Sequence, residues 1–265
     1  MMQIQPKCPV FGTCGGCFYQ DKDYSLQIEL KKKDIRETFA RAGLVVPADI
    51  KVFFKQEYYY RNRMDFVFSK GGPGFREKGK FNKVVNFDKC HISNIGINHG
   101  LSKVIEWFEK NKEQLDIFDL NNNTGTLRYA TIRSSFFSKD TSVTFIVNRE
   151  SDKIQKHKPF FEEFAAENPK INVLMGMVKH NTDLSATDEY EVISGSDVIF
   201  ENLGPLKFYY YTQGFFQNNS QVMMDILLYI KGNITKKYDN LIDLFGGVGT
   251  IGLFFGGFGG KGDSN

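Results

Sequence analysis

The alternation of apolar and polar residues predicts short strands interleaved with amphipathic helices. Over 23–42, Ile28, Ile35 and Phe39 fall on one helical stripe, charged residues fill the opposite face, and Gly43 follows as a C-terminal cap. Further helices are predicted over 98–114, 153–167 and about 219–235, and strands over 51–55, 58–69, 81–88, 127–137, 142–148, 171–179, 190–200 and 206–211. Strands and helices segregated in this way predict an α+β fold with an antiparallel sheet.

The pattern changes near residue 212. The apolar segment 240–245 is predicted to be a strand, and it runs directly into the glycine-rich turn 246–252. A strand, a glycine turn and a helix start open many nucleotide-binding α/β folds. We therefore expect the beginning of a Rossmann-like α/β domain here. The glycine-dense tail after residue 256 is predicted to be a poor helix and a poor second strand.

The composition is that of a soluble globular protein, with 41% hydrophobic and 25% charged residues among 265. No run of about 18 apolar residues occurs, which predicts no transmembrane helix and no membrane partner. The first residues lack the apolar core of a signal peptide. We expect a cytoplasmic, reducing location, where clustered cysteines usually bind metal or do chemistry and rarely form disulfides.

Positive charge is concentrated in one stretch of the chain. Residues 51–90 hold ten Lys or Arg and four acids, a net of +6, although the whole chain carries only +3. Aromatic residues, among them Tyr58, Tyr60 and Phe75, are interleaved with these cations. Cations for phosphates and rings for unstacked bases favour a nucleic-acid surface. A solvated hairpin with aromatic cross-strand packing accounts for the same residues equally well.

All four cysteines fit one pattern. Cys8, Cys14 and Cys17 lie within ten residues, and Cys90 follows Cys17 after a gap of 72 residues. Structural zinc sites usually present two short-spaced pairs, whereas three clustered ligands and one remote ligand are more typical of an iron–sulfur cluster. Zinc remains the main alternative, and free or disulfide-bonded thiols are a third. With every cysteine in this set, none is left over as a catalytic nucleophile.

Two segments near the C-terminus have a binding and a purely structural interpretation. The loop 213–219 carries two adjacent aromatics and several amides, which suit base stacking and hydrogen bonding to a ligand. The same loop also reads as a helix N-cap at Asn219 with Phe215 or Phe216 as a hydrophobic staple. The turn around Gly247 and Gly249 allows close backbone approach to a ligand, but such turns are common. In a dinucleotide-binding fold, an acidic residue about 20 positions later binds the ribose hydroxyls. That position falls beyond residue 265.

Seven segments, taken in order, carry a resemblance that none of them carries alone. They are Cys8–Gln20, Tyr60–Arg63, Gly74–Gly79, Cys90, Leu127–Arg133, Phe215–Asn219 and Asp243–Leu253. This series resembles the S-adenosylmethionine-dependent RNA uracil-C5 methyltransferases, which make 5-methyluridine in tRNA or large-subunit rRNA. The match extends to about residue 255 and lacks the N-terminal TRAM barrel of some members.

The resemblance implies a role for each matching residue. It implies that Cys8, Cys14, Cys17 and Cys90 hold a structural [4Fe–4S] cluster. It implies that Gln217 and Phe245 contact S-adenosylmethionine, with Gly247 and Gly249 under its methionine end and Thr250 at a position where many members carry Asn. The candidate RNA-binding residues come from the charge and aromatic pattern: Arg61, Arg63, Arg76 and Lys78 of the basic stretch, and Phe215 of the loop 213–219. The family's domain plan corresponds to an iron–sulfur and basic-hairpin part at 1–95, the rest of an RNA-binding central domain at 96–205, and a methyltransferase portion at 206–265.

The sequence departs from that family in its chemistry. A family member adds a cysteine to carbon 6 of uracil, and a glutamate base later removes the carbon-5 proton. Both residues belong to the later part of the methyltransferase domain, and we find neither here, so we expect no catalytic residue and no activity from this chain alone. The leading interpretation is a truncated, monomeric RNA uracil-C5 methyltransferase acting on structured RNA. The rivals are a non-catalytic iron–sulfur RNA-binding module and a zinc-stabilised RNA-binding domain.

Overall fold

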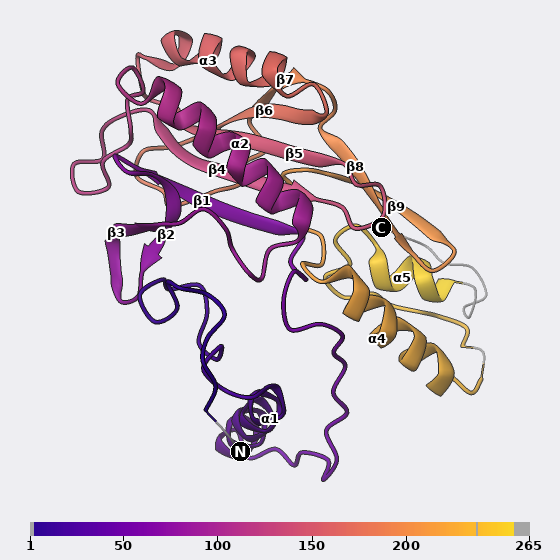
Figure 1. The fold of residues 1–265 in the computed structure, drawn as a ribbon. Coiled ribbons are helices and arrows are strands. Elements are labelled where there is room, and N and C mark those ends of the chain that lie inside the picture. Colours follow the sequence, from indigo (N-terminus) through magenta and orange to yellow (C-terminus); the bar gives the residue numbers. More distant parts are fainter. Residues whose placement is uncertain (1–2, 237, 257–265) are drawn as a thin grey trace.

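A seven-stranded sheet and a separate two-stranded sheet organise the protein (Figure 1). The computed structural model describes residues 3–236 and 238–256. The elements are α1 (Tyr24–Arg41), β1 (Arg63–Ser69), β2 (Gly72–Glu77), β3 (Lys80–Asn86), α2 (Ile95–Asn111), β4 (Leu127–Ser134), β5 (Thr141–Asn148), α3 (Ile154–Glu167), β6 (Ile171–Val178), β7 (Tyr190–Ser194), β8 (Val198–Leu203), β9 (Leu206–Tyr211), α4 (Ser220–Asn233) and α5 (Thr250–Phe255). Among these residues, no helix is long and apolar enough to cross a membrane.

The large sheet has the strand order β3-β2-β1-β4-β5-β6-β7. Every neighbouring pair is antiparallel except β5 and β6, which run parallel. A parallel pair needs a crossover connection, and α3 provides it. The prediction of strands segregated from helices around a mainly antiparallel sheet is therefore confirmed for this part of the chain, with one parallel exception.

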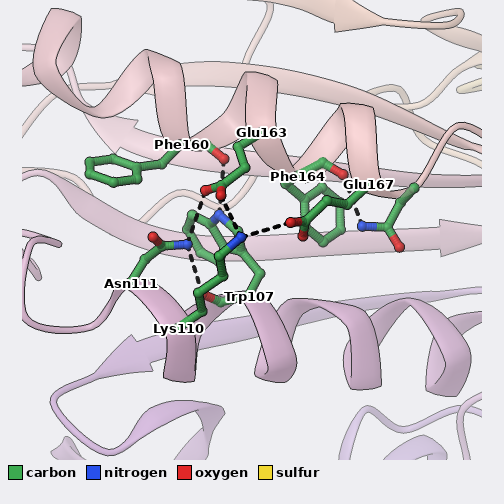
Figure 2. Close-up of polar contacts among 8 residues, drawn as sticks. Trp107, Lys110, Asn111, Phe160, Glu163, Phe164 and Glu167 are labelled. Carbon is green, nitrogen blue, oxygen red and sulfur yellow. Dashed lines mark hydrogen bonds and ion pairs between the residues drawn. The ribbon is translucent and has the colours of Figure 1, made fainter.

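One face of the large sheet holds the main apolar core under α2 and α3. Trp107 of α2 lies 4.7 Å from the ring of Phe145 on β5, and Phe145 stacks at 4.6 Å on Phe161 of α3. The Trp107 indole N–H also donates to the backbone oxygen of Phe160 at 2.9 Å (Figure 2). At the solvent edge Lys110 pairs with Glu163 and Glu167 of α3 (Figure 2). The indole thus joins both helices to the sheet.

The opposite face of the sheet is unusually polar. In the pairing of β1 with β4, Asp65 lies opposite Thr131 and Arg63 lies opposite Arg133. Because side chains alternate along a strand, these four side chains share one face of the sheet. The segment 179–188 crosses this face: Thr131 donates to the backbone oxygen of Ser185 at 2.7 Å, and the Ser185 hydroxyl donates to Asp65 at 2.8 Å. On this face Thr131 and Arg133 are buried, while Arg63 and Asp65 stay partly exposed.

The second sheet, β8 and β9, packs with α4 and α5 around its own apolar cluster. The buried members of this cluster are Ile199, Leu203, Phe208, Tyr210, Phe216, Met223, Leu227 and Phe255. The predicted strand 190–200 is divided at Gly195, whose φ of +80° suits glycine and directs β8 away from the large sheet.

Two predicted strands are wrong. Residues 51–55 form no strand, because Phe53 packs its ring against Tyr229 of α4 at 5.1 Å and gains its packing there without pairing. Residues 240–245 form none either, since no strand of the described chain lies beside them and Leu244 and Phe245 face solvent. The predicted helix start after the glycine turn is confirmed by α5. The glycine-dense tail from residue 257 lies outside the described residues.

Candidate nucleic-acid interface and cysteine pocket

The four cysteines line one pocket, although they come from two distant segments. Cys8, Cys14 and Cys17 lie in the N-terminal loop, and Cys90 precedes α2. Apolar side chains form much of the remaining wall: Val10, Phe11, Phe75, Phe87 and Ile92. All four thiols are free of disulfides. The convergence predicted from the spacing is therefore present in the fold.

Two polar side chains with no role assigned from the sequence, Gln20 and Asn98, form hydrogen bonds with the segments that carry the cysteines. Gln20 accepts from the backbone N–H of Cys8 at 3.2 Å and donates to the sulfur of Cys17 at 3.3 Å. Asn98, in the first turn of α2, accepts from the backbone N–H of Cys90 at 2.9 Å and donates to its oxygen at 3.0 Å. The position of Gln20 three residues after Cys17 was the available signal, and for Asn98 there was none.

Burial favours the protonated form of three of the four thiols. Burial raises the pKa of Cys14 to about 11, and burial also raises the pKa values of Cys8 and Cys17. In the described part of the chain, no group of three or more His, Cys, Asp or Glu side chains is already arranged to hold a metal ion. The donor set fits a thiolate-binding metal, while the side chains have to turn and lose protons to bind it.

The basic hairpin lies against this cysteine loop. The backbone N–H of Gly15 donates to the oxygen of Arg76 at 2.9 Å, and the N–H of Lys78 donates to the oxygen of Thr13 at 2.8 Å. A Cβ added at Gly15 would lie 3.1 Å from the Arg76 oxygen, so glycine allows the close approach. The loop and the end of β2 therefore form one surface.

A groove runs along that surface. One hollow of about 420 Å³ is lined by Gly15, Gly16, Phe18, Asp65, Val67, Phe75, Arg76, Glu77, Lys78, Gly79 and Tyr129. A second hollow of about 250 Å³ is lined by Gly16, Arg61, Arg63, Met64, Asp65, Phe75 and Asn218. Because the two hollows share Gly16, Asp65 and Phe75, they form a continuous groove from the cysteine loop to the loop before α4.

The four predicted cationic RNA contacts all line this groove, but they are not equivalent. Arg76 is held by Asp183 at 2.5 Å and by Tyr129 at 2.8 Å, and Arg63 is held by Asp65 at 3.0 Å. Among the described residues, Arg61 and Lys78 form no ion pair with a carboxylate. Arg61 and Lys78 are therefore the groove cations most available to a phosphate.

Asn62 joins this groove to the loop 213–219. This fully buried side chain donates to the backbone oxygen of Gln217 at 2.8 Å and to the hydroxyl of Ser220 at 2.9 Å. Its backbone N–H donates to the oxygen of Asn218 at 3.0 Å. Asn62 belongs to the matching segment Tyr60–Arg63, but the sequence indicates no role for it.

The aromatic pair of the loop divides into a buried and an exposed ring. Phe216 stacks on Tyr210 at 4.2 Å inside the smaller apolar cluster, and Phe215 is 67% exposed. Asn219 caps α4 by accepting from the N–H of Val222 at 3.1 Å. The predicted N-cap at Asn219 is thus confirmed, Phe216 is buried in the core, and Phe215 is exposed toward solvent.

The glycine turn lies on the same small unit as this loop. Gly247 and Gly249 have φ values of +57° and +73°, which other residues rarely adopt. Asp243 accepts from the N–H of Gly252 at 2.8 Å, and Thr250 is buried at the start of α5. Val248 and Phe216 belong to one apolar cluster, which brings the turn and the loop together. Phe245 extends into solvent.

The chain is similar to curated RNA methyltransferases over nearly its whole length. It is 28% identical over 267 residues to a tRNA (uracil(54)-C(5))-methyltransferase of Pyrococcus abyssi, which covers 100% of the chain and 61% of that protein. It is 30% identical over 254 residues to an uncharacterized RNA methyltransferase of Leptospira interrogans, covering 94% of the chain and 54% of that protein. The chain thus spans little more than half the length of these relatives. No family model matches it.

A solved structure shares the fold. The crystal structure of the Pyrococcus abyssi tRNA (uracil-54, C5)-methyltransferase in complex with S-adenosyl-L-homocysteine superposes with a TM-score of 0.70 at 24% identity, covering 94% of this chain and 57% of that one. The sheets and helices described above therefore share their fold with the corresponding part of that structure. The chain is a homologue of RNA methyltransferases, tRNA uracil-C5 methyltransferases among them.

Proposed function

We propose that this chain binds structured RNA, tRNA or large-subunit rRNA, as part of a uracil-C5 methylation system that uses S-adenosylmethionine. The observation that carries the proposal is the continuous groove between Lys78 and Asn218, joined through Asn62 to the backbone of Gln217. An RNA placed against Arg61 and Lys78 would lie beside the loop predicted to contact the cofactor. The names of the homologous proteins support the same chemistry.

In this proposal each part of the chain has a separate task. Residues 1–95 supply the cysteine pocket and basic hairpin, 96–205 complete the RNA-binding domain, and 206–265 supply the cofactor loop and turn. Arg61 and Lys78 bind phosphates, and the exposed ring of Phe215 stacks on a base that has left its helix. Gln217 and the backbone of Gly247 and Gly249 approach the cofactor.

We further propose that Cys8, Cys14, Cys17 and Cys90 hold a [4Fe–4S] cluster. Four sulfur donors converge in one largely apolar pocket, which suits thiolate ligation of iron. When bound, the cluster supplies a structural link between the N-terminal loop and the segment before α2. The residues around it do the positioning, with Gln20 and Asn98 orienting the backbone of the ligand segments.

The chain on its own is proposed to be inactive in methyl transfer. Addition of a thiolate to carbon 6 of uracil makes carbon 5 nucleophilic, and a base must then remove the carbon-5 proton. All four thiols of the sequence line the cysteine pocket, so none is placed to attack a uracil in the groove. The groove carboxylates are also engaged, Asp65 with Arg63 and Glu77 with Lys80.

Anaerobically purified protein tests these proposals together. Titration with a tRNA transcript and with large-subunit rRNA fragments should give binding that weakens steeply with salt, and incubation with RNA and labelled S-adenosylmethionine should transfer no methyl group. Iron and sulfide analysis should match a four-iron cluster. Absence of RNA binding would refute the function, methyl transfer would refute the inactivity, and stoichiometric zinc would refute the cluster.

A further inference from the structure

The cysteine loop forms one end of the groove, and an exposed aromatic ring, that of Phe18, lies there. Phe18 is 63% exposed and lines the larger hollow together with Arg76, Lys78 and Tyr129. The ammonium of Lys78 lies 5.3 Å from the centre of the Phe18 ring. A ring and a cation at this spacing match the two chemical parts of a nucleotide, a flat base and a phosphate.

This ring is held on a fixed support. Gly15 and Thr13 of the same loop make backbone hydrogen bonds at 2.9 and 2.8 Å to Arg76 and Lys78 of the hairpin. Three residues after Gly15, the chain presents Phe18 outward while Tyr19 and Gln20 turn back toward the protein. A ring on a fixed support loses little conformational freedom when a base stacks on it.

The charges around the ring favour an anionic ligand. Two carboxylates line the hollow, but Glu77 is paired with Lys80, and Asp65 is paired with Arg63 and accepts from Ser185 at 2.8 Å. Lys78 is exposed and, in the described part of the chain, forms no ion pair with a carboxylate. Its ammonium is therefore free to leave the ring for a phosphate.

We propose that Phe18 and Lys78 form a subsite for one unpaired nucleotide of RNA, with the base stacked on the ring and its phosphate on the lysine. The inference rests on the proposed RNA binding and adds that the strand passing the cysteine loop is single. Bases within a duplex have both faces covered by neighbouring bases, so only an unpaired base can stack on the ring. Stacking requires no particular base, and the subsite tolerates any sequence.

A second exposed phenylalanine provides a matched control. Phe81 of β3 is 64% exposed and does not line the groove. If Phe18 were only a solvent-exposed ring without a ligand, Phe18→Ala and Phe81→Ala would behave alike. Lys83, an exposed lysine of the same strand that also lies outside the groove, is the corresponding control for Lys78.

The experiment is a titration of the full chain with a short single-stranded RNA that carries a fluorescent adenine analogue quenched by stacking. Phe18→Ala and Phe18→Leu should each lose the quenching and weaken binding about tenfold, while Phe18→Tyr keeps both. Lys78→Ala should lower the salt dependence of binding by about one unit of slope. Phe81→Ala and Lys83→Ala should behave like the unchanged protein.

The outcomes separate this subsite from the broader function. Quenching and affinity that survive Phe18→Ala, or that fall equally in Phe81→Ala, overturn the subsite while RNA binding by the groove stands. A protein that prefers duplex RNA to single strands, without quenching, overturns it as well. If the unchanged chain binds neither the single strand nor tRNA, the proposed function fails and the subsite fails with it.

Discussion

Asn62 and Gln217, 155 positions apart in sequence, are joined by a hydrogen bond of 2.8 Å from the Asn62 amide to the Gln217 backbone oxygen. Asn62 stands between two groove arginines, and Gln217 belongs to the loop predicted to contact the cofactor. A change in the groove can thus reach that loop through one buried side chain. The relationship makes Asn62 a positioning residue.

Asn62→Asp should loosen the loop 213–219 without removing a groove cation. The carboxylate has the shape of the amide but cannot donate to Gln217 or Ser220, and the cost of the two lost bonds is about 1–3 kcal/mol in the free energy of unfolding. Urea unfolding measures that cost, and hydrogen exchange should show faster exchange in residues 213–221. Asn82→Ala, at an exposed asparagine, is the control. Unchanged exchange in Asn62→Asp would contradict the assignment.

Substitution of any one pocket cysteine by serine should reduce bound metal to a trace. Each thiol occupies one wall of the same pocket, so none can be replaced by another. Metal analysis and visible absorbance measure the loss, and limited proteolysis should detect loosening of the N-terminal loop. Ser102→Ala, at a partly exposed serine of α2 outside the pocket, serves as the control. Full metal content after Cys90→Ser would exclude that residue as a ligand.

Charge reversal should separate the groove cations into two classes. Arg61→Glu and Lys78→Glu should weaken RNA binding and flatten its salt dependence, because each removes a cation that has no carboxylate partner among the described residues. Their unfolding curves should stay close to that of the unchanged protein. Lys83→Glu adds the same charge outside the groove. Equal weakening by Lys83→Glu would mean that net charge, and not the groove, governs affinity.

Arg76 should stabilise the fold in a pH-dependent way. Its hydrogen bond holds the pKa of Asp183 in the folded protein below the usual value. The ionised carboxyl therefore stabilises the native state fully at pH values above its pKa in the unfolded chain, about 3.9. This contribution is lost as the pH falls through the lower pKa of the folded state. Both side chains are partly exposed, which limits the contribution to less than about 1 kcal/mol. Acid unfolding of Asp183→Asn should lack this component. An identical acid profile in both proteins would contradict the prediction.

Trp107 should dominate the packing of α2 against α3. Trp107→Ala leaves a cavity beside Phe145 and Phe161 and should cost about 3–5 kcal/mol in the free energy of unfolding. Lys110→Ala, one turn away at the solvent edge, removes two exposed ion pairs and should have a much smaller effect. Thermal unfolding compares the two variants. Equal destabilisation would show that the ion pairs matter as much as the indole.

Local patterning was sufficient for most of the elements. The helices and most of the strands lie close to their predicted bounds, although β2 was not among the predicted strands. The predicted apolar stripe of α1 contains no buried residue, so there the pattern gave the helix but not its packing. The two wrong strands, 51–55 and 240–245, are apolar runs without a partner strand in the described chain. An apolar run indicates burial or binding, while pairing depends on what lies beside it, and that information is not local.

The sequence by itself determined the chemical inventory: four thiols in one set, a basic aromatic stretch and a glycine turn. Only the tertiary structure decided how this inventory is used. It placed Cys90 beside the N-terminal loop and linked Asn62 to Gln217. It also separated Arg63 and Arg76, which are paired with carboxylates, from Arg61 and Lys78, which have no carboxylate partner among the described residues. The physical reason is that pairing, burial and hydrogen bonding depend on neighbours across the sheet, which are far away along the chain.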